Sequence, residues 1–218
     1  VGQLKKAITL LEEAKKPMFL IGGGVNLAHA QQEMTKLAEK IDAPVITTVM
    51  GRGAISTEHP LYIGNIGMHG SYAANKTADE CDLMFSIGCR FNDRVTGEIK
   101  KFAPNAKIVH IDIESAAISR NVTVDIPIVA DAKAAILKIL EHTEPMKHEE
   151  WLSEVESWDK EYPLQMEVKD GVNPQRIIET LNEVYADRDT VFTSDVGQHQ
   201  MWAAQYLKLD ATHRLVQS

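Results

Sequence analysis

Short, mostly apolar runs alternate with helical patterns through the first two thirds of the chain. The runs lie at 18–21, 44–48, 83–87, 107–113 and 122–129, and apolar residues recur at helical spacing in 3–16, 28–41, 71–80 and 131–142. Strands that are apolar throughout are buried on both faces, as in a parallel sheet between two layers of helices. The pattern therefore predicts a doubly wound α/β domain with a parallel sheet over residues 1–143.

The composition changes after this domain. Residues 144–171 are charged and lack strand signals, so they are expected to form a linker with one polar helix near 150–160. Beyond it, Pro174 stands where a helix would begin, and an apolar strand is predicted at 190–193. Residues 172–218 are therefore expected to be the truncated start of a second α/β domain.

Charge and cysteine content exclude several classes of protein. The net charge is -8 with the basic residues scattered, which argues against a nucleic-acid-binding protein and favours small-molecule ligands. Cys81 and Cys89 form neither a disulfide framework nor a zinc motif, which suits a reducing compartment. No apolar run approaches the roughly 20 residues that a membrane span requires.

Three consecutive glycines follow the first predicted strand and precede a helix. Residues 22–24 could bring backbone amides close to a phosphate, or could form a tight turn, and the pattern favours neither reading. The fingerprint GxGxxG is incomplete, because Leu27 occupies its third glycine position and Thr47 and Thr48 stand where an acid should end the second strand. This disfavours an NAD-dependent dehydrogenase.

Two further loops carry side chains that could meet a ligand. The loop 67–70 has a glycine at each end and presents Met68 and His69, which taken alone are better read as a packed methionine and a satisfied loop histidine. The third predicted strand leads into Arg90 and Arg94. Ligands of open α/β sheets bind at the carboxyl ends of the strands, and the arginine fork suits phosphate or carboxylate, so this segment predicts an anion site.

Acidic and polar residues follow other predicted elements. Asp112 ends the fourth strand, where it could accept from ribose hydroxyls, although capping the next turn is the simpler role. Asp131 is expected to cap the helix 131–142. The turn at Gly197 leads into a helix whose first residues, Gln198 and His199, could hold a diphosphate, although a lone histidine on a helix is usually structural.

Five segments together resemble one protein family over essentially the whole chain. In order they read GGGVN, GMHGSYAAN, GCRFNDRVTG, HIDIE and SDVGQHQMWAAQY. They are similar to the large, catalytic subunits of biosynthetic acetolactate synthases, which have three α/β domains. The resemblance implies an internal piece of such a subunit, with the six-stranded central domain that binds FAD and the first part of the domain that binds thiamine diphosphate.

The resemblance also implies roles for individual residues. Arg94 would receive the carboxylate of the second 2-oxoacid, and Met68 would border the same pocket. Gly197, Gln198 and His199 would contact the diphosphate of thiamine diphosphate. The residues that would line FAD are Gly22, Gly23, Gly24, Thr48, Val49, Gly67, His69, Gly70, Gly88 and Arg90, with Asp112, Ile113 and Asp131 at its adenosine end.

The family reaction condenses two pyruvates, or pyruvate and 2-oxobutyrate, with loss of CO2, as a step of branched-chain amino acid biosynthesis. The ligands of Mg2+ and the glutamate that activates the cofactor are expected outside this chain, so the isolated chain is expected to be inactive. The resemblance further implies a homodimer or homotetramer of large subunits, with which a regulatory small subunit is compatible. A bacterial cytoplasm or a eukaryotic organelle would be the compartment, without nucleic-acid or membrane partners.

Other readings of the sequence remain open at this point. Glyoxylate carboligase, pyruvate oxidase and the FAD-free catabolic acetolactate synthase share the architecture. A non-catalytic nucleotide-binding module, such as a relative of the NAD-dependent deacylases or a domain like those of electron-transfer flavoproteins, is an alternative from a different class. A deacylase is disfavoured because two cysteines cannot form its four-cysteine zinc site.

Overall fold

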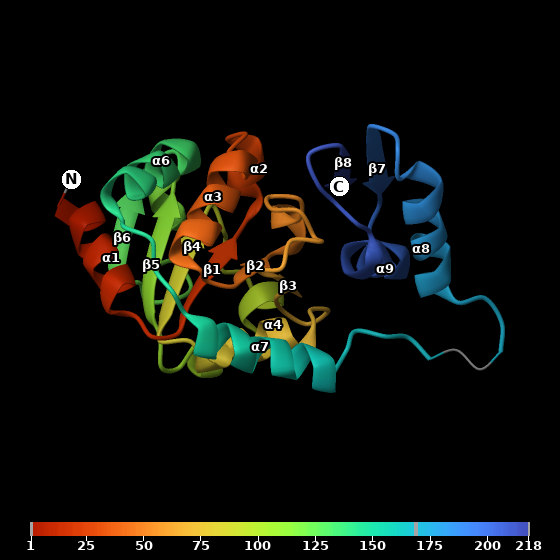
Figure 1. The fold of residues 1–218 in the computed structure, drawn as a ribbon, viewed down its shortest axis with the longest axis horizontal. Helices are drawn as coiled ribbons and strands as arrows, with labels where there is room; N and C mark the ends of the chain where they lie inside the picture. The colour runs from red at the N-terminus through yellow and green to blue at the C-terminus, as the bar shows by residue number, and fades with distance from the viewer. Residues whose placement is uncertain (1, 168–169, 218) are drawn as a thin grey trace.

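The computed structural model describes residues 2–167 and 170–217 of the chain (Figure 1). Its elements, in chain order, are α1 (Gly2–Glu13), β1 (Pro17–Ile21), α2 (Gly23–Leu27), α3 (Gln31–Ile41), β2 (Val45–Thr47), the 3₁₀ turn η1 (Val49–Gly51), β3 (Tyr62–Asn65), α4 (Tyr72–Glu80), β4 (Leu83–Ile87), α5 (Asp93–Thr96), η2 (Ile99–Lys101), β5 (Lys107–Asp112), η3 (Ser115–Ala117), β6 (Ile126–Val129), α6 (Ala132–His142), α7 (Glu149–Glu161), α8 (Pro174–Tyr185), β7 (Thr190–Ser194), α9 (Gln198–Tyr206) and β8 (His213–Gln217).

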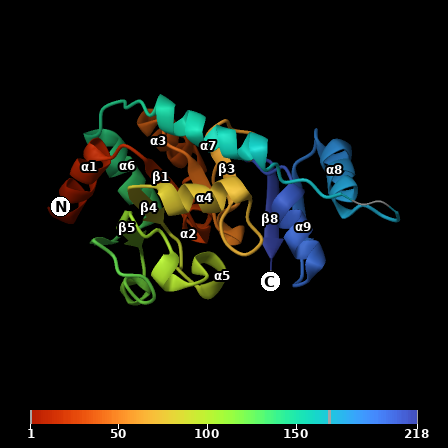
Figure 2. The ribbon, with the colours of Figure 1, turned by 90° about the horizontal axis from the view of Figure 1, so that it is seen from below.

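Six parallel strands form the larger sheet, in the order β3-β2-β1-β4-β5-β6. Successive residues of β1 point to opposite faces. Phe19 and Ile21 pack with α1, α3 and α6, whereas Met18 and Leu20 pack with α4 and α7. Figure 2 shows α4 and α7 together over their face of the sheet. Both faces are covered, as the continuous apolar strands predicted.

All five apolar runs form strands, but the sequence analysis missed β3. This strand reads Tyr-Ile-Gly-Asn, lies at the edge of the sheet and is mostly half-buried, so it lacks the continuous apolar signal of the inner strands. The short helix α2 was also missed, because its first two residues are glycines. On α6, Ala135, Ile136 and Ile139 face the core, whereas Ala134 and Leu137 are exposed.

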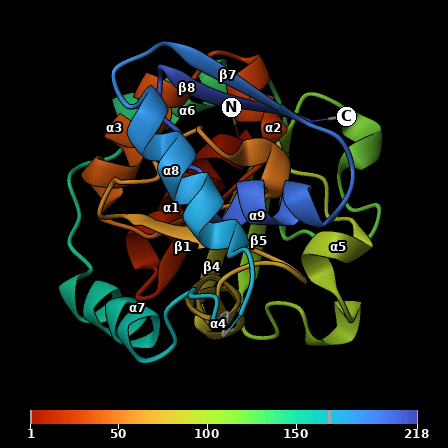
Figure 3. The ribbon, with the colours of Figure 1, turned by 90° about the vertical axis from the view of Figure 1, so that its right-hand side faces the viewer.

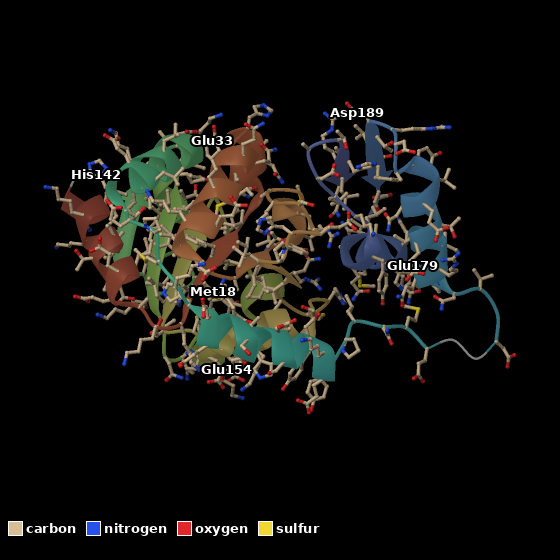
Figure 4. The ribbon with its side chains drawn as sticks, viewed as in Figure 1. Met18, Glu33, His142, Glu154, Glu179 and Asp189 are labelled. Carbon is tan, nitrogen blue, oxygen red and sulfur yellow. The ribbon has the colours of Figure 1, made fainter. Side chains whose placement is uncertain are left out.

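The helix α7 is more than a polar helix over a linker. Trp151 is buried to 2% exposure and donates its indole N–H to the carbonyl of Pro17 at 3.0 Å. Lys16 Nζ lies 2.7 Å from a carboxylate oxygen of Glu154, which is marked on α7 in Figure 4. The first part of the predicted linker therefore packs on the larger sheet. Two residues of that linker, Val168 and Lys169, lie outside the described residues.

The remaining elements, α8, β7, α9 and β8, lie beside the β3 edge of the larger sheet (Figure 1), and they stand in front of that sheet in Figure 3. They have a small apolar core of their own, in which Ala203, Leu207 and Leu209 are buried and Phe192 and Leu215 pack against them. The strands β7 and β8 are parallel, with Thr190 opposite His213. Among the described residues, every helix is too short or too polar to cross a bilayer.

Candidate functional site

The carboxyl ends of the six parallel strands lie along one edge of the sheet, which we call the carboxyl edge. The chain leaves β1 toward β2 and β3, then returns to β4 on the other side of β1, so the strand order reverses between β1 and β4. Open α/β sheets bind ligands at such a switch point. The residues predicted to line a ligand follow the strands in this order along the edge: Gly67 after β3, Thr48 after β2, Gly22 after β1, Gly88 after β4, Asp112 at the end of β5 and Asp131 after β6.

At the switch point, two glycine turns pack backbone against backbone. The amide of Gly24 donates to the carbonyl of Gly88 at 3.0 Å. A Cβ at Gly22 would lie 2.1 Å from the oxygen of Gly88, and one at Gly24 would lie 2.7 Å from the Gly88 Cα. Gly88 itself has φ +60°, which favours glycine. The geometry thus requires Gly22, Gly24 and Gly88 for the turn; Gly23 is less confined, with Met50 Cβ 3.2 Å from its ideal Cβ.

The turn after β2 is braced by side chains. Thr48 is 9% exposed and its Oγ1 accepts from the amide of Gly51 at 3.2 Å, at the start of η1. Val49 is half-buried in the same turn. Asn26 on α2 donates to the carbonyls of Met50 at 3.1 Å and Arg52 at 2.9 Å. The β2 turn is therefore tied to the glycine-rich turn after β1.

The loop 67–70 lies directly against α5. The amide of Met68 donates to the carbonyl of Arg94 at 3.3 Å, and Gly67, with φ +100°, has no room for a side chain because its Cβ would lie 2.1 Å from that oxygen. A Cβ at Gly70 would lie 2.1 Å from the carbonyl oxygen of Asn65. The side chains of Met68, at 68% exposure, and His69 face solvent. The loop presents an apolar surface beside an arginine.

Both predicted arginines lie at the carboxyl edge and are exposed. Arg90 follows β4 and its side chain is 81% exposed, with Nη2 3.8 Å from a carboxylate oxygen of Glu114 after β5. Arg94 lies on α5, whose N-terminus is capped by Asn92 accepting from the Val95 amide at 3.1 Å. Exposed guanidinium groups at a switch point can bind anionic groups of a ligand.

The β5 and β6 end of the carboxyl edge carries two carboxylates that serve as local caps. Asp112 accepts from the amide of Glu114 at 2.9 Å, and Asp131 accepts from the amide of Ala134 at the start of α6, also at 2.9 Å. The capping role expected for each residue alone is therefore observed. Ile113, between them along the edge, is 72% exposed and offers an apolar surface.

A buried, uncharged histidine lies near this end of the carboxyl edge. Burial lowers the pKa of His110, whose Nε2 lies 2.9 Å from the carbonyl of Cys89 and whose ring packs edge-on against Phe91. Burial also raises the pKa of the Cys89 thiol to about 12. Both groups are therefore uncharged near neutral pH, so the exposed Arg90 and Arg94, rather than these two buried groups, supply positive charge at the edge.

The predicted diphosphate residues lie apart from the carboxyl edge, at the start of α9. Gly197 is the N-cap residue of this helix and provides no capping side chain. Gln198 and His199 are exposed in the first turn, and the ring of His199 lies over Gly197, where a Cβ would be 2.7 Å from Cε1. An uncapped helix N-terminus preceded by glycine has the donors that a diphosphate needs.

The sequence analysis missed four residues that position these segments. Asn75 on α4 accepts from the Gly67 amide at 2.9 Å and donates to the Gly67 and Ser71 carbonyls at 3.1 Å. Arg52 and Asn65 join the turns after β2 and β3 to the end of α9, and Asn26 braces η1. The sequence signal that could have identified such residues is a polar residue in an otherwise apolar or glycine-rich motif, such as Asn75 in GMHGSYAAN.

The structure brings Met68, His69 and Arg94 together, and a third segment joins them because Gln205 on α9 donates to the His69 carbonyl at 3.0 Å. It places Asp112, Ile113 and Asp131 at the far end of the same edge. Gln198 and His199 lie at the N-terminal end of α9, and at a rise of about 1.5 Å per residue this end is about 13 Å from the C-terminal end of the helix. Among the described residues, no group of three or more His, Cys, Asp or Glu side chains could hold a metal ion.

Comparison with known proteins gives one family match and several close relatives. A family model described as thiamine pyrophosphate enzyme, central domain, matches residues 4–139, which include all six strands of the larger sheet. The chain is 43% identical to a probable acetolactate synthase large subunit of Methanococcus aeolicus, over 99% of this chain and 39% of that protein. It is 46% identical to a protein of the same description from Methanocaldococcus jannaschii, over 94% of this chain and 36% of that protein. It is 39% identical to the acetolactate synthase isozyme 3 large subunit of Escherichia coli K12, over 100% of this chain and 39% of that protein. The chain thus spans at most 39% of the length of these three relatives.

Proposed function

The chain belongs to the thiamine pyrophosphate enzymes, whose central domain it carries at residues 4–139, and from this premise we propose that the whole protein is the large, catalytic subunit of an acetolactate synthase. On this proposal it joins two pyruvates, or pyruvate and 2-oxobutyrate, and releases CO2, in branched-chain amino acid biosynthesis. The identity of 39–46% to three proteins described as acetolactate synthase large subunits supports it.

One observation of the structure carries the proposal. The amide of Met68 donates to the Arg94 carbonyl, so two segments distant in sequence form one surface at the carboxyl edge, and α9 reaches the same surface through Gln205. This surface combines a polarizable apolar side chain, an exposed guanidinium and a neighbouring helix. A short 2-oxoacid has a carboxylate for the guanidinium and an apolar end for the methionine.

The residues of the chain have distinct roles in this proposal. Arg94 receives the carboxylate of the second 2-oxoacid with two parallel N–H donors, and Met68 limits the pocket beside it. The amides at Gly197, Gln198 and His199 hold the diphosphate of thiamine diphosphate. When bound, that cofactor supplies the electron sink that decarboxylation of a 2-oxoacid requires. The ligands of Mg2+ are assigned to parts of the whole protein beyond this chain.

FAD is assigned to the carboxyl edge. Exposed apolar residues, exposed arginines and glycine turns without side chains follow one another along this edge, which suits an elongated ligand with aromatic and anionic parts. Its proposed contacts are Gly22, Gly23, Gly24, Thr48, Val49, Gly67, His69, Gly70, Gly88, Arg90, Asp112, Ile113 and Asp131. In this assignment the FAD domain comprises residues 1–143, the linker 144–171 and the start of the thiamine diphosphate domain 172–218.

The proposal extends to partners. The relatives are described as large subunits, which supports a regulatory small subunit as a partner of this protein. A homodimer or homotetramer of large subunits is the proposed assembly, in a bacterial cytoplasm or a eukaryotic organelle.

The test is product analysis with the purified whole protein. We expect acetolactate from pyruvate when thiamine diphosphate, Mg2+ and FAD are supplied, and no product from the isolated 218-residue chain. A preference for glyoxylate, or formation of acetyl phosphate, would assign the protein to another branch of the family. Product formation without FAD would contradict the flavin assignment.

A further inference from the structure

A buried arginine joins the turn after β2 to the last turn of α9. The guanidinium of Arg52 donates to the carbonyls of Ala204 and Leu207 and lies 3.3 Å from the hydroxyl of Tyr62. Its side chain is only 6% exposed. We call this contact, together with Asn65, the α9 anchor, because Asn65 Nδ2 also donates to the Ala204 carbonyl at 2.7 Å.

The carbonyls that Arg52 binds belong to the end of a helix. The last carbonyls of a helix have no partner within it and carry its negative partial charge, so a cation is favourable there. In a continued helix the amide of Lys208 would donate to the carbonyl of Ala204, but here it donates to Asn182 Oδ1 at 3.0 Å. The anchor therefore supplies the C-terminal hydrogen bonds that the helix itself lacks.

Arg52 is deeply buried, and the acceptors of its hydrogen bonds within residues 2–167 and 170–217 are the neutral oxygens of Tyr62, Ala204 and Leu207. Burial lowers the pKa of Arg52, but guanidinium remains protonated at neutral pH. Its charge is stabilised by the carbonyl dipoles at the end of α9, and this stabilisation depends on how those carbonyls are oriented toward the guanidinium. A displacement of α9 along or around its axis would leave a buried charge without its acceptors, so the contact restrains the helix strongly.

The same anchor is connected to the carboxyl edge. Asn65 Oδ1 accepts from Thr47 Oγ1 at 3.0 Å, and Thr47 is the last residue of β2, directly before Thr48. The carbonyl of Arg52 accepts from Asn26 on α2. Thus the end of α9 is bonded to the turns after β1, β2 and β3, while the other end of the same helix carries Gly197, the uncapped N-cap residue.

We propose that Arg52 is a positioning residue for thiamine diphosphate: by holding the C-terminal end of α9, it sets where the helix presents its N-terminal amides to the diphosphate. This inference rests on the proposed cofactor role of Gly197, Gln198 and His199. A nine-residue helix moves as a rigid rod, so a restraint on one end determines the position of the other. Loss of the restraint lowers affinity through the cost of ordering the helix at binding.

The test uses the whole protein with three variants. Arg52→Met keeps the apolar stem and removes all donors, and Arg52→Lys restores a charge and part of the hydrogen bonding. Lys208→Met is the matched control, because Lys208 pairs with Glu58 and so joins the same two segments, but through side chains that are more than 60% exposed. Dissociation constants for thiamine diphosphate with Mg2+ and for FAD are measured by calorimetry, together with the thermal midpoint without cofactors.

We expect Arg52→Met to raise the dissociation constant of thiamine diphosphate at least tenfold, with Arg52→Lys between it and the wild type. In Arg52→Met, the FAD affinity and the KM for pyruvate at saturating thiamine diphosphate should stay within twofold of the wild type. In Lys208→Met, the affinities for thiamine diphosphate and for FAD should both stay within twofold of the wild type. Unchanged thiamine diphosphate affinity in Arg52→Met, or an equal loss of both cofactors, would overturn the proposal. If Arg52→Met does not fold, Asn65→Ala takes its place and must weaken thiamine diphosphate binding at least threefold.

The proposed function and the role of Arg52 can be refuted by different results. A wild-type protein that binds thiamine diphosphate but makes a product other than acetolactate would refute the acetolactate synthase assignment and leave the Arg52 comparison intact. A wild-type protein that binds no thiamine diphosphate would overturn both.

Discussion

The amide of Met68 and the carbonyl of Arg94 are 3.3 Å apart, which connects the loop after β3 to the helix after β4 across two intervening strands, β2 and β1. Gly67 makes this approach possible, since any Cβ there would collide with the same carbonyl. The contact places an exposed methionine beside an exposed arginine at the switch side of the sheet. The predictions below test the turns, the loop and the charges that build this edge.

Substitution of Gly22 by alanine should destabilise the fold. Its Cβ would lie 2.1 Å from the Gly88 oxygen and 2.4 Å from the Cys89 Cα, both backbone atoms that cannot move without opening the sheet edge. Overpacking of this kind costs about 3 kcal/mol. Urea unfolding gives the free energy. Gly23→Ala is the control, expected to cost under about 1 kcal/mol because its Cβ would lie 3.2 Å from the Met50 Cβ and 3.3 Å from the Met50 carbonyl oxygen, contacts that a small shift relieves. Equal losses in the two variants would contradict this account.

Asn75→Ala should loosen the loop 67–70. The variant loses three hydrogen bonds to Gly67 and Ser71, two of which satisfy both backbone groups of Gly67, at a cost of about 2 kcal/mol. We expect lower stability in urea and a raised KM for pyruvate in the whole protein. Lys76→Ala removes a half-buried pair with Glu80 on the same helix and a contact of Lys76 Nζ with the Trp158 ring, and it should cost about 1 kcal/mol and leave the KM unchanged. A normal KM in Asn75→Ala would show that the loop does not need this brace.

Arg94 and Arg90 should respond differently to the loss of charge. Arg94→Gln should lower kcat/KM for pyruvate by about 100-fold, since a lost charge-assisted, bidentate contact is worth about 3 kcal/mol. Arg90→Gln should weaken FAD binding instead and change kcat/KM little at saturating FAD. Steady-state kinetics and FAD titration of both variants distinguish the roles. If the two phenotypes are exchanged, the roles assigned to the two arginines are reversed.

The pair of Asp210 and His213 should make part of the stability dependent on pH. Partial burial alone would raise the pKa of Asp210, but hydrogen bonds from Thr212 and His213 outweigh it and lower the pKa to about 2. The carbonyl of Tyr185 and the Asp210 carboxylate raise the pKa of His213 above 6.5. The ionised carboxylate stabilises the fold fully above pH 3.8, and this stabilisation is lost as the pH falls toward 2. The imidazolium stabilises the fold fully below pH 6.5, and this stabilisation is lost as the pH rises through the folded pKa of His213.

The stabilisation from this pair is therefore largest between pH 3.8 and 6.5. The measurement is the urea midpoint of the wild type minus that of His213→Gln, taken at pH 3, 5.5 and 9. We expect the largest difference at pH 5.5 and a smaller one at each extreme. A difference that does not vary with pH would show that His213 stabilises the turn as a neutral group.

Much of the candidate site followed from local sequence. The run Met18–Ile21 is fully apolar and Leu83–Ile87 is interrupted only by Ser86, so both predicted buried strands, and in a parallel sheet the residues directly after them lie at one edge. The capping roles of Asp131 and Asp112 also depend on the next few residues alone. The glycines at 22 and 88 were visible as a turn signal, but the need for glycine was not, because Gly22 avoids backbone atoms of the turn after β4 and Gly88 avoids backbone atoms of α2, each about 65 residues away.

By itself, then, the sequence determined five of the six strands of the larger sheet, its parallel α/β class, and which loops carry arginine and glycine, since these depend on periodicity and on local backbone freedom. The tertiary structure decided the rest. It added the edge strand β3, whose half-buried Tyr-Ile-Gly-Asn has no continuous apolar signal, and packed α7 on the sheet through Trp151. It also directed Arg52 into a buried contact with α9, because a cation finds the open carbonyls of a helix end only after distant segments have folded together.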